Sequence, residues 1–139
     1  SAYGLFCVGL KNDGTLWTWG ANDSGQLGDG TLQSKSSPVQ IGSDFVKIAA
    51  GLNHALAVKS DGSLWAWGSN TKGQLGDDTT TNHNAPVKVG DGYADVAAGE
   101  SHSLGLKKDG TLWAWGYNGS GQVGDGTTVD KHIPVNIAN

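Results

Sequence analysis

The stretch that decides the fold is "GTLWTWGANDSGQLGDG", residues 14–30, in which two tryptophans stand one residue apart and glycines follow at short intervals. The same phrase returns as "GSLWAWGSNTKGQLGDD" at 62–78 and as "GTLWAWGYNGSGQVGDG" at 110–126. Trp19, Trp67 and Trp115 mark the period, because 67 − 19 and 115 − 67 both equal 48. A constant period of this length indicates a solenoid, a propeller or an array. The repeats run approximately over 1–48, 49–96 and 97–139, as a single three-repeat segment.

Composition narrows the class of protein. The chain has 139 residues with 23 glycines, six tryptophans and no methionine, which favours turns and flat strands over helices. Its net charge is −4 and all nine basic residues are lysines, so we expect no nucleic-acid surface. No segment resembles a membrane span, so we also expect no membrane partner. Nothing in it resembles a signal peptide or a lipid anchor, and the compartment stays unknown. The single cysteine, Cys7, excludes an intrachain disulfide.

Each repeat carries the local signals of four short strands. In the middle repeat these are "VKIAAG" from Val46, "HALAVKS" from His54, "SLWAWG" from Ser63 and "APVKVG" from Ala85. The Asp61-Gly62 pair between the second and third is favoured in tight hairpins. Four strands per unit is the anatomy of a propeller blade. The sequence therefore predicts an all-β fold, a β-propeller of four-stranded antiparallel blades with about three blades.

The hairpin also predicts which residues share a face. If Asp61-Gly62 is a two-residue loop, Val58 lies opposite Trp65 and Leu56 opposite Trp67, and directly opposed residues share a face. The other face of the sheet then carries the smaller side chains of Ala55, Ala57, Leu64 and Ala66. We expect the bulky face of one blade to pack on the small-residue face of the next.

These motifs resemble a known family. The segments "IAAGLNHALAVKSDGSLWAWGSNTKGQLGD" at 48–77 and "VAAGESHSLGLKKDGTLWAWGYNGSGQVGD" at 96–125 are similar to units of the regulator of chromosome condensation repeat family. The resemblance implies a propeller, typically of seven blades, that serves as a rigid platform for binding other proteins. Its founding member is similar to guanine nucleotide exchange factors and also binds chromatin, and bacterial relatives include secreted β-lactamase inhibitors. A shared fold transfers none of these activities.

Three blades do not close a propeller ring, which needs about four to eight. The end blades would expose complementary, head-to-tail surfaces, and such surfaces close into rings or grow into filaments. One expectation is additional blades in a longer propeller, since Ser1 is not an initiating methionine and aligns with the mid-strand residue Ala49. The other is self-association of two copies into a six-bladed ring. Solution mass would separate them.

The repeats differ where partners would bind. The segments 32–37, 80–85 and 128–133 differ almost completely at equal length, and 43–47 differs from 91–95. A constant frame with variable loops is typical of a binding platform, although drifting surface loops give the same pattern. The candidate residues for binding a protein partner are Leu32, Gln33, Lys35, Phe45, Asn82, His83, Asn84, Tyr93, Val129, Asp130, Lys131 and His132.

Catalytic or metal-binding motifs are harder to find in this sequence. His54 and His102 are repeat-equivalent, and Phe6 in the third slot indicates a structural ring rather than a catalyst or ligand. Asn22 and Asn118 match the glycosylation pattern, which is short enough to occur by chance. We expect no catalytic, metal or cofactor site. The predicted function is a non-catalytic module for protein–protein interaction or structural assembly. The alternatives are a component of a secreted or virion surface array, an exchange-factor-like regulator, and an inhibitor of an enzyme such as a β-lactamase.

Overall fold

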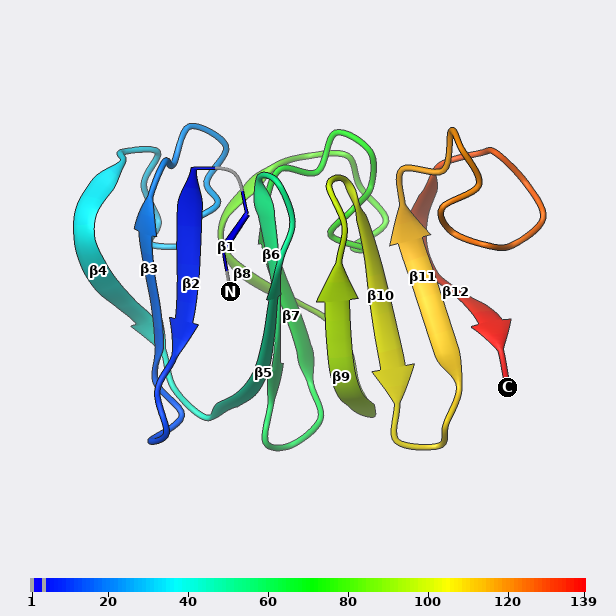
Figure 1. Ribbon diagram of the computed structural model, residues 1–139, viewed down its shortest axis with the longest axis horizontal. Coiled ribbons are helices and arrows are strands. Elements are labelled where there is room, and N and C mark those ends of the chain that lie inside the picture. Colours follow the sequence, from blue (N-terminus) through cyan, green and yellow to red (C-terminus); the bar gives the residue numbers. More distant parts are fainter. Residues whose placement is uncertain (1, 4) are drawn as a thin grey trace.

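The computed structural model describes residues 2–3 and 5–139. This part of the chain contains twelve strands and no helix. They form three four-stranded antiparallel sheets, each built from consecutive strands. Blade 1 contains β1 to β4, blade 2 contains β5 to β8 and blade 3 contains β9 to β12. Figure 1 shows the sheets side by side in an arc, with β5 lying against both β2 and β9. The predicted propeller fold is confirmed, as three blades of an open ring.

The strand bounds repeat from blade to blade. In blade 1 they are Ala2–Tyr3, Phe6–Leu10, Leu16–Gly20 and Lys35–Gly42 for β1 to β4. In blade 2 they are Phe45–Ala50, His54–Lys59, Leu64–Gly68 and His83–Gly90 for β5 to β8. In blade 3 they are Tyr93–Ala98, His102–Lys107, Leu112–Gly116 and Lys131–Ala138 for β9 to β12. The expected repeat limits at 49 and 97 fall inside β5 and β9, because blades 2 and 3 begin with these strands.

The hairpin between β6 and β7 is one residue longer than expected. The backbone N–H of Lys59 donates to Ser63 O at 2.9 Å, which leaves a three-residue loop, 60–62. Gly62 takes the left-handed conformation (φ +87°) that closes such a loop with a bulge. The carboxylate of Asp61 accepts bonds from the N–H and hydroxyl of Ser63 and stabilises the turn.

This extra residue reverses the predicted faces. Ala57 pairs with Trp65 and Ala55 with Trp67, because a slip of one residue moves every side chain to the other side of a sheet. The predicted pairs of Val58 with Trp65 and of Leu56 with Trp67 are therefore wrong. Each blade instead has a tryptophan face and an aliphatic face. In blade 2 the tryptophan face carries Trp65, Trp67, Ala55 and Ala57. The aliphatic face carries Leu56, Val58, Leu64 and Ala66.

Adjacent blades pack the tryptophan face of one on the aliphatic face of the preceding one. At the blade 1/2 interface, Trp67 packs in one buried cluster with Phe6, Val8 and Leu16. At the blade 2/3 interface, Trp115 packs with the aliphatic face of blade 2. The residues paired with the first tryptophan of each blade are small: Gly9 is opposite Trp17, Ala57 opposite Trp65 and Gly105 opposite Trp113. The two interfaces are thus two copies of one design.

The Gly-Gln-Leu-Gly motif completes each interface. The indole N–H of Trp67 donates to Gln26 O at 2.9 Å, and Trp115 donates to Gln74 O at the same distance. Gly28 is required here because a Cβ atom on it would lie 2.8 Å from Cδ1 of Trp67. Leu27 is fully buried beneath the loop. The motif is therefore a socket for the tryptophan of the next blade.

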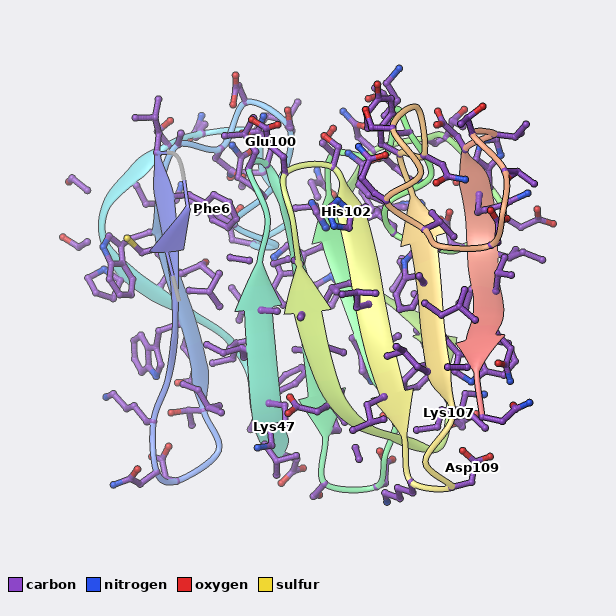
Figure 2. All side chains as sticks on the ribbon, turned by 45° about the vertical axis from the view of Figure 1, so that its right-hand side comes forward. Phe6, Lys47, Glu100, His102, Lys107 and Asp109 are labelled. Atoms are coloured by element: carbon purple, nitrogen blue, oxygen red, sulfur yellow. The ribbon has the colours of Figure 1, made fainter. Side chains whose placement is uncertain are left out.

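The blades have two distinct ends. The loop end holds the long segments 21–34, 69–82 and 117–130, and the hairpin end holds the turns 11–15, 60–63 and 108–111. In Figure 2, Glu100 and His102 lie toward the loop end, whereas Lys107 and Asp109 lie at the hairpin end. Within the described residues there is no long apolar helix of the kind that crosses a membrane.

Candidate functional site

Ten of the twelve predicted partner-binding residues lie at the loop end, in or just after the long loops. The other two, Phe45 and Tyr93, do not. They begin β5 and β9 at the hairpin end and are only 3% and 2% exposed. Phe45 belongs to the blade 1/2 cluster and Tyr93 to the blade 2/3 cluster, where its ring meets Trp115 edge to face. Their prediction as contact residues is corrected, because both rings fill the blade interfaces.

Three of the predicted residues anchor their own loops. Lys35, His83 and Lys131 occupy one position of the repeat, and each faces an aspartate. The distances are 3.7 Å from Lys35 to Asp29, 2.6 Å from His83 to Asp77 and 3.1 Å from Lys131 to Asp125. Burial raises the pKa of Asp77, but hydrogen bonds from Thr79, Asn70 and His83 outweigh it and hold the pKa below its usual value.

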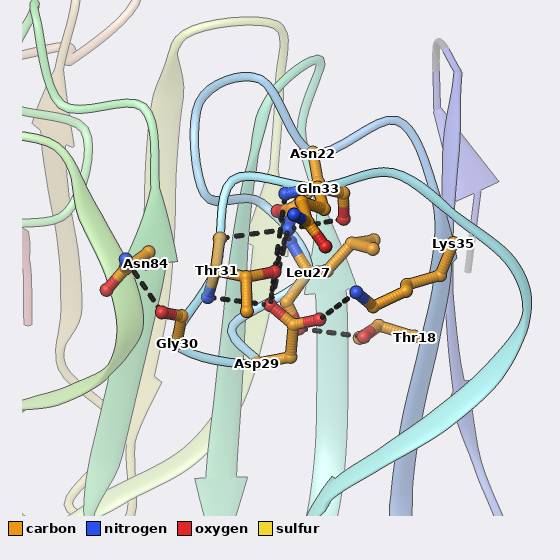
Figure 3. Close-up of polar contacts among 9 residues, drawn as sticks. All are labelled: Thr18, Asn22, Leu27, Asp29, Gly30, Thr31, Gln33, Lys35 and Asn84. Atoms are coloured by element: carbon orange, nitrogen blue, oxygen red, sulfur yellow. Dashed lines mark hydrogen bonds and ion pairs between the residues drawn. The ribbon is translucent and has the colours of Figure 1, made fainter.

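A buried asparagine organises each long loop, and Figure 3 shows the one in blade 1. The side-chain oxygen of Asn22 accepts the N–H of Leu27 at 3.0 Å. Its side-chain nitrogen donates to the carbonyls of Thr31 and Gln33, at 2.9 and 3.0 Å, and to Asp29 at 3.3 Å. Asn118 repeats this arrangement in full, and Asn70 repeats it except for the second carbonyl. All three are fully buried, so the amides of Asn22 and Asn118 are inaccessible as glycosylation acceptors.

We expect Asn70→Ala to lower the free energy of unfolding by about 2–3 kcal/mol, because it leaves buried hydrogen-bonding partners unsatisfied. The partners are Leu75 N, the Asp77 carboxylate and Thr79, all within 3.1 Å. Urea melts of the variant measure the effect. Asn12→Ala, in an exposed hairpin turn, is the control and should change stability by less than about 0.5 kcal/mol. Equal melts for both variants would contradict the role of the amide.

The loops of blades 1 and 2 together form a groove of about 350 Å³ across their interface. Four of the predicted residues line it, one from blade 1 and three from blade 2. The full lining is Asp23, Ser24, Leu32, Asn82, His83, Asn84, Ala85 and Val87. Sequence reasoning missed Asp23 and Ser24, since they belong to the motif region and only the fold brings them next to β8. Asn84 fixes the two loops together, since its side-chain nitrogen donates to Gly30 O at 3.2 Å and its carbonyl accepts Gly30 N–H at 2.8 Å.

A larger hollow, of about 460 Å³, lies at the hairpin end. Its lining includes Lys11, Asp13 and Gly14, which recur unchanged as Lys59, Asp61 and Gly62. The groove at the loop end is the better candidate for selective binding, because its lining varies between repeats. The described residues contain no group of three His, Cys, Asp or Glu side chains suited to a metal ion.

Four-stranded antiparallel blades, joined twice through the same tryptophan-in-socket interface, define this chain as a segment of a β-propeller. The model of the Regulator of chromosome condensation (RCC1) repeat matches residues 13–58, 61–106 and 109–139. The chain belongs to this family. A second model of the same repeat matches residues 45–74 and 93–122.

Known relatives extend well beyond this chain. The human E3 ubiquitin-protein ligase HERC2 is 42% identical over 57 residues, which are 38% of this chain and 1% of HERC2. An RCC2 homologue of Xenopus laevis is 46% identical over 50 residues, covering 33% of this chain and 10% of that protein. The structure of Prp20p from Saccharomyces cerevisiae superposes with a TM-score of 0.84 at 27% identity, covering 99% of this chain and 37% of Prp20p. Prp20 in complex with Kap60 gives the same TM-score, at 28% identity and 36% coverage of that chain.

Proposed function

We propose that this propeller segment is a non-catalytic module that binds a segment of another protein in the loop-end groove between blades 1 and 2. The observation that carries the proposal is the contrast between frame and loops. The asparagine clusters and tryptophan sockets recur with the same main hydrogen bonds, while the groove is lined mostly by residues that differ between repeats. Rigid scaffolds that present variable loops are a common design for recognition.

The side chains that line the groove favour an extended peptide with an apolar side chain and, on either side of it, free backbone carbonyl and N–H groups. Leu32 is 61% exposed, an apolar contact held on a loop that hydrogen bonds keep in place. Asn82 and Asn84 line the same groove. Within the described residues, Nδ2 of Asn82 and Oδ1 of Asn84 make no hydrogen bond, so they remain to donate and accept. An extended peptide offers matching carbonyl and N–H groups.

A displayed library of random short peptides, selected on the immobilised chain, tests the proposal. We expect the selected peptides to bind the Leu32→Ser variant about tenfold more weakly, since removing an apolar contact of this size costs about 1–2 kcal/mol. Fluorescence anisotropy of labelled peptides measures the affinities.

The matched control for that experiment is Val46→Ser. Val46 is also an exposed aliphatic residue, at 48%, but it lies in β5 at the hairpin end. Selected peptides should bind this variant as they bind the unaltered chain. Failure to select any peptide, or equal weakening by both substitutions, would contradict the assignment of the groove.

A second candidate is regulation of a small GTPase, favoured by the likeness to Prp20p, whose structure was described together with its binding to Gsp1p and histones. This chain spans about a third of Prp20p, so that activity comes to it only as a hypothesis. Accelerated release of a fluorescent guanine nucleotide from a small GTPase would support it. An unchanged release rate would leave the peptide-binding role as the better account.

A further inference from the structure

The hairpin-end hollow of about 460 Å³ lies between blades 1 and 2, and the same position occurs once more in the chain, between blades 2 and 3. Most of its lining recurs there as the same or a similar residue type. Two positions differ in charge. Gly92 replaces Asp44, and Lys108 replaces Ser60, one repeat further along the chain. The hollow lies between two described blades and is separate from the outer faces of the arc.

At the blade 2/3 position, the side chain of Lys108 fills the space. A Cβ atom added to Gly62 would lie 3.0 Å from Nζ of Lys108 and 3.3 Å from its Cε, so the ammonium group rests against this glycine. At Gly14, the counterpart of Gly62, the three nearest atoms all belong to the backbone, at 3.5 to 3.6 Å. Ser60 has only a short hydroxyl side chain where Lys108 has a long one. The hollow between blades 1 and 2 therefore remains open.

The open hollow also carries one carboxylate more than its counterpart. Asp13 and Asp44 both line it. At the blade 2/3 position only the first has a counterpart, Asp61. The N–H and hydroxyl of Thr15 donate to Oδ1 of Asp13, at 3.0 and 2.6 Å, and lower the pKa of this carboxyl, which is ionised at neutral pH. Within the described residues neither Asp13 nor Asp44 forms an ion pair. Two carboxylates are thus available to a cation that enters the hollow.

The rest of the lining suits a long aliphatic side chain. Lys11, the cation in this lining, has Nζ 4.4 Å from the centroid of the Trp17 ring. Lys59 lies outside the lining, with Nζ over the rings of Phe45 and Trp65. Apolar surface next to carboxylates matches lysine, whose methylene stem packs along apolar surface while its charged head stays at the edge. The apolar part of the lining consists of Leu10, Phe45 and Val46.

We propose that this hollow binds a lysine side chain of a partner protein, with the methylene stem on the apolar lining and the ammonium group beside the carboxylates of Asp13 and Asp44. Lys108 is the internal precedent, because the chain itself seats a lysine in the equivalent space with one carboxylate fewer. Complementary charge then selects a cation over a neutral or anionic side chain. The hollow and the loop-end groove lie at opposite ends of the blades, so either proposal can fail without the other.

Titration of the isotope-labelled chain with Nα-acetyl-lysine methylamide, followed by NMR, tests the proposal. We expect saturable shifts of the backbone amide signals of Asp44, Phe45 and Ser60. The norleucine counterpart of this probe has the same aliphatic chain without the ammonium group. It should bind about fivefold more weakly, because it loses the attraction of the carboxylates. Equal binding of both probes, the absence of any saturable shift, or the same shifts with potassium chloride alone would overturn the proposal.

Variants at two positions test where the ammonium group lies. Asp44→Asn should weaken binding of the lysine probe about threefold, and asparagine tolerates the left-handed conformation of this position (φ +66°). Ser60→Lys should weaken it about tenfold, because the new side chain competes for the hollow from within the chain. Glu100→Gln removes an exposed carboxylate toward the loop end (Figure 2) and, as the control, should leave binding unchanged. Circular dichroism checks that each variant folds. If either folded variant at 44 or 60 bound the probe as the unaltered chain does, the proposed site would be wrong.

Discussion

Trp67→Ala should lower the free energy of unfolding by about 3–5 kcal/mol, as expected for deletion of a large buried aromatic side chain. Trp67 is fully buried in the blade 1/2 cluster. Its indole N–H donates to Gln26 O, and Gly28 lies against the edge of the ring. Alanine would leave a cavity between two sheets that neighbouring side chains fill poorly. It would also leave the carbonyl of Gln26 without its hydrogen-bond donor. Urea or thermal melts followed by far-UV circular dichroism measure the loss.

The repeats supply the control for this substitution. Trp19 occupies the same position of the repeat but lies partly exposed on the outer face of blade 1, and no neighbouring blade of the described chain covers it. In dilute solution Trp19→Ala should therefore cost about 1–2 kcal/mol, less than Trp67→Ala, since less surface is withdrawn from water. Equal losses at the two positions would show that the blade interface is not what stabilises this chain.

Stability should also fall as the pH drops below 6.5, because His54 is buried in its neutral form. Burial and the nearby His102 lower the pKa of His54 from its ordinary 6.5 to about 3. The unfolded chain takes up a proton as the pH passes 6.5, while the folded chain does not until about 3. The free energy of unfolding therefore decreases by about 1.4 kcal/mol per pH unit between these values. Above pH 6.5 the stability that neutral His54 allows is fully present, and below a pH of about 3 the loss due to His54 is complete.

The hydrogen-bond chain explains why the neutral form is retained. The Ser103 hydroxyl donates to Gln74 O at 2.7 Å, so Nε2 of His54 must carry the hydrogen that it donates to Ser103. Within the described residues Nδ1 of His54 has no hydrogen-bond partner, and a proton added there would place a charge inside the buried interface.

The blade 1/2 interface provides the substitution that tests this, since it uses Phe6 and Ala55 at the same two positions. The double variant His54→Phe, Ser103→Ala should lose about one proton from the pH dependence of unfolding between 6.5 and about 4.5, a difference of about 3 kcal/mol. Denaturant melts across this range measure the slope. Ser103→Ala alone keeps the buried ring and should keep the slope. An unchanged slope in the double variant would assign the acid sensitivity to other groups.

Much of the fold could be predicted from the sequence, because the same signals occur three times at one spacing. The strands, their antiparallel order and the blade arc all follow from the Asp-Gly turns and the paired tryptophans. The faces could not be predicted, since they depend on a single residue in the hairpin loop. Asp61-Gly62 fits both a two-residue loop and a three-residue loop closed by Gly62, and only the structure shows the second.

The candidate site was less accessible to sequence reasoning. The variable segments mark the loop end, but variation alone does not tell which residues come together. Leu32 and Asn84 line one groove from two different blades. Phe45 and Tyr93 lie in segments whose other residues change between repeats, yet an aromatic ring at one repeat position is itself a sign of packing. The asparagines at 22, 70 and 118 gave a usable signal, a constant polar residue ahead of each socket, which was overlooked.

Because the two blade interfaces use the same contacts, the gene can gain or lose whole repeats. Every socket accepts the tryptophan of the next unit, so unequal recombination between the coding repeats can insert or delete whole units and leave each remaining junction chemically intact. A crossover out of phase by even one codon in a hairpin would instead shift the strand pairing of that blade and move its indoles to the other face of the sheet. Such a gene is free to change the number of its units, but not their length.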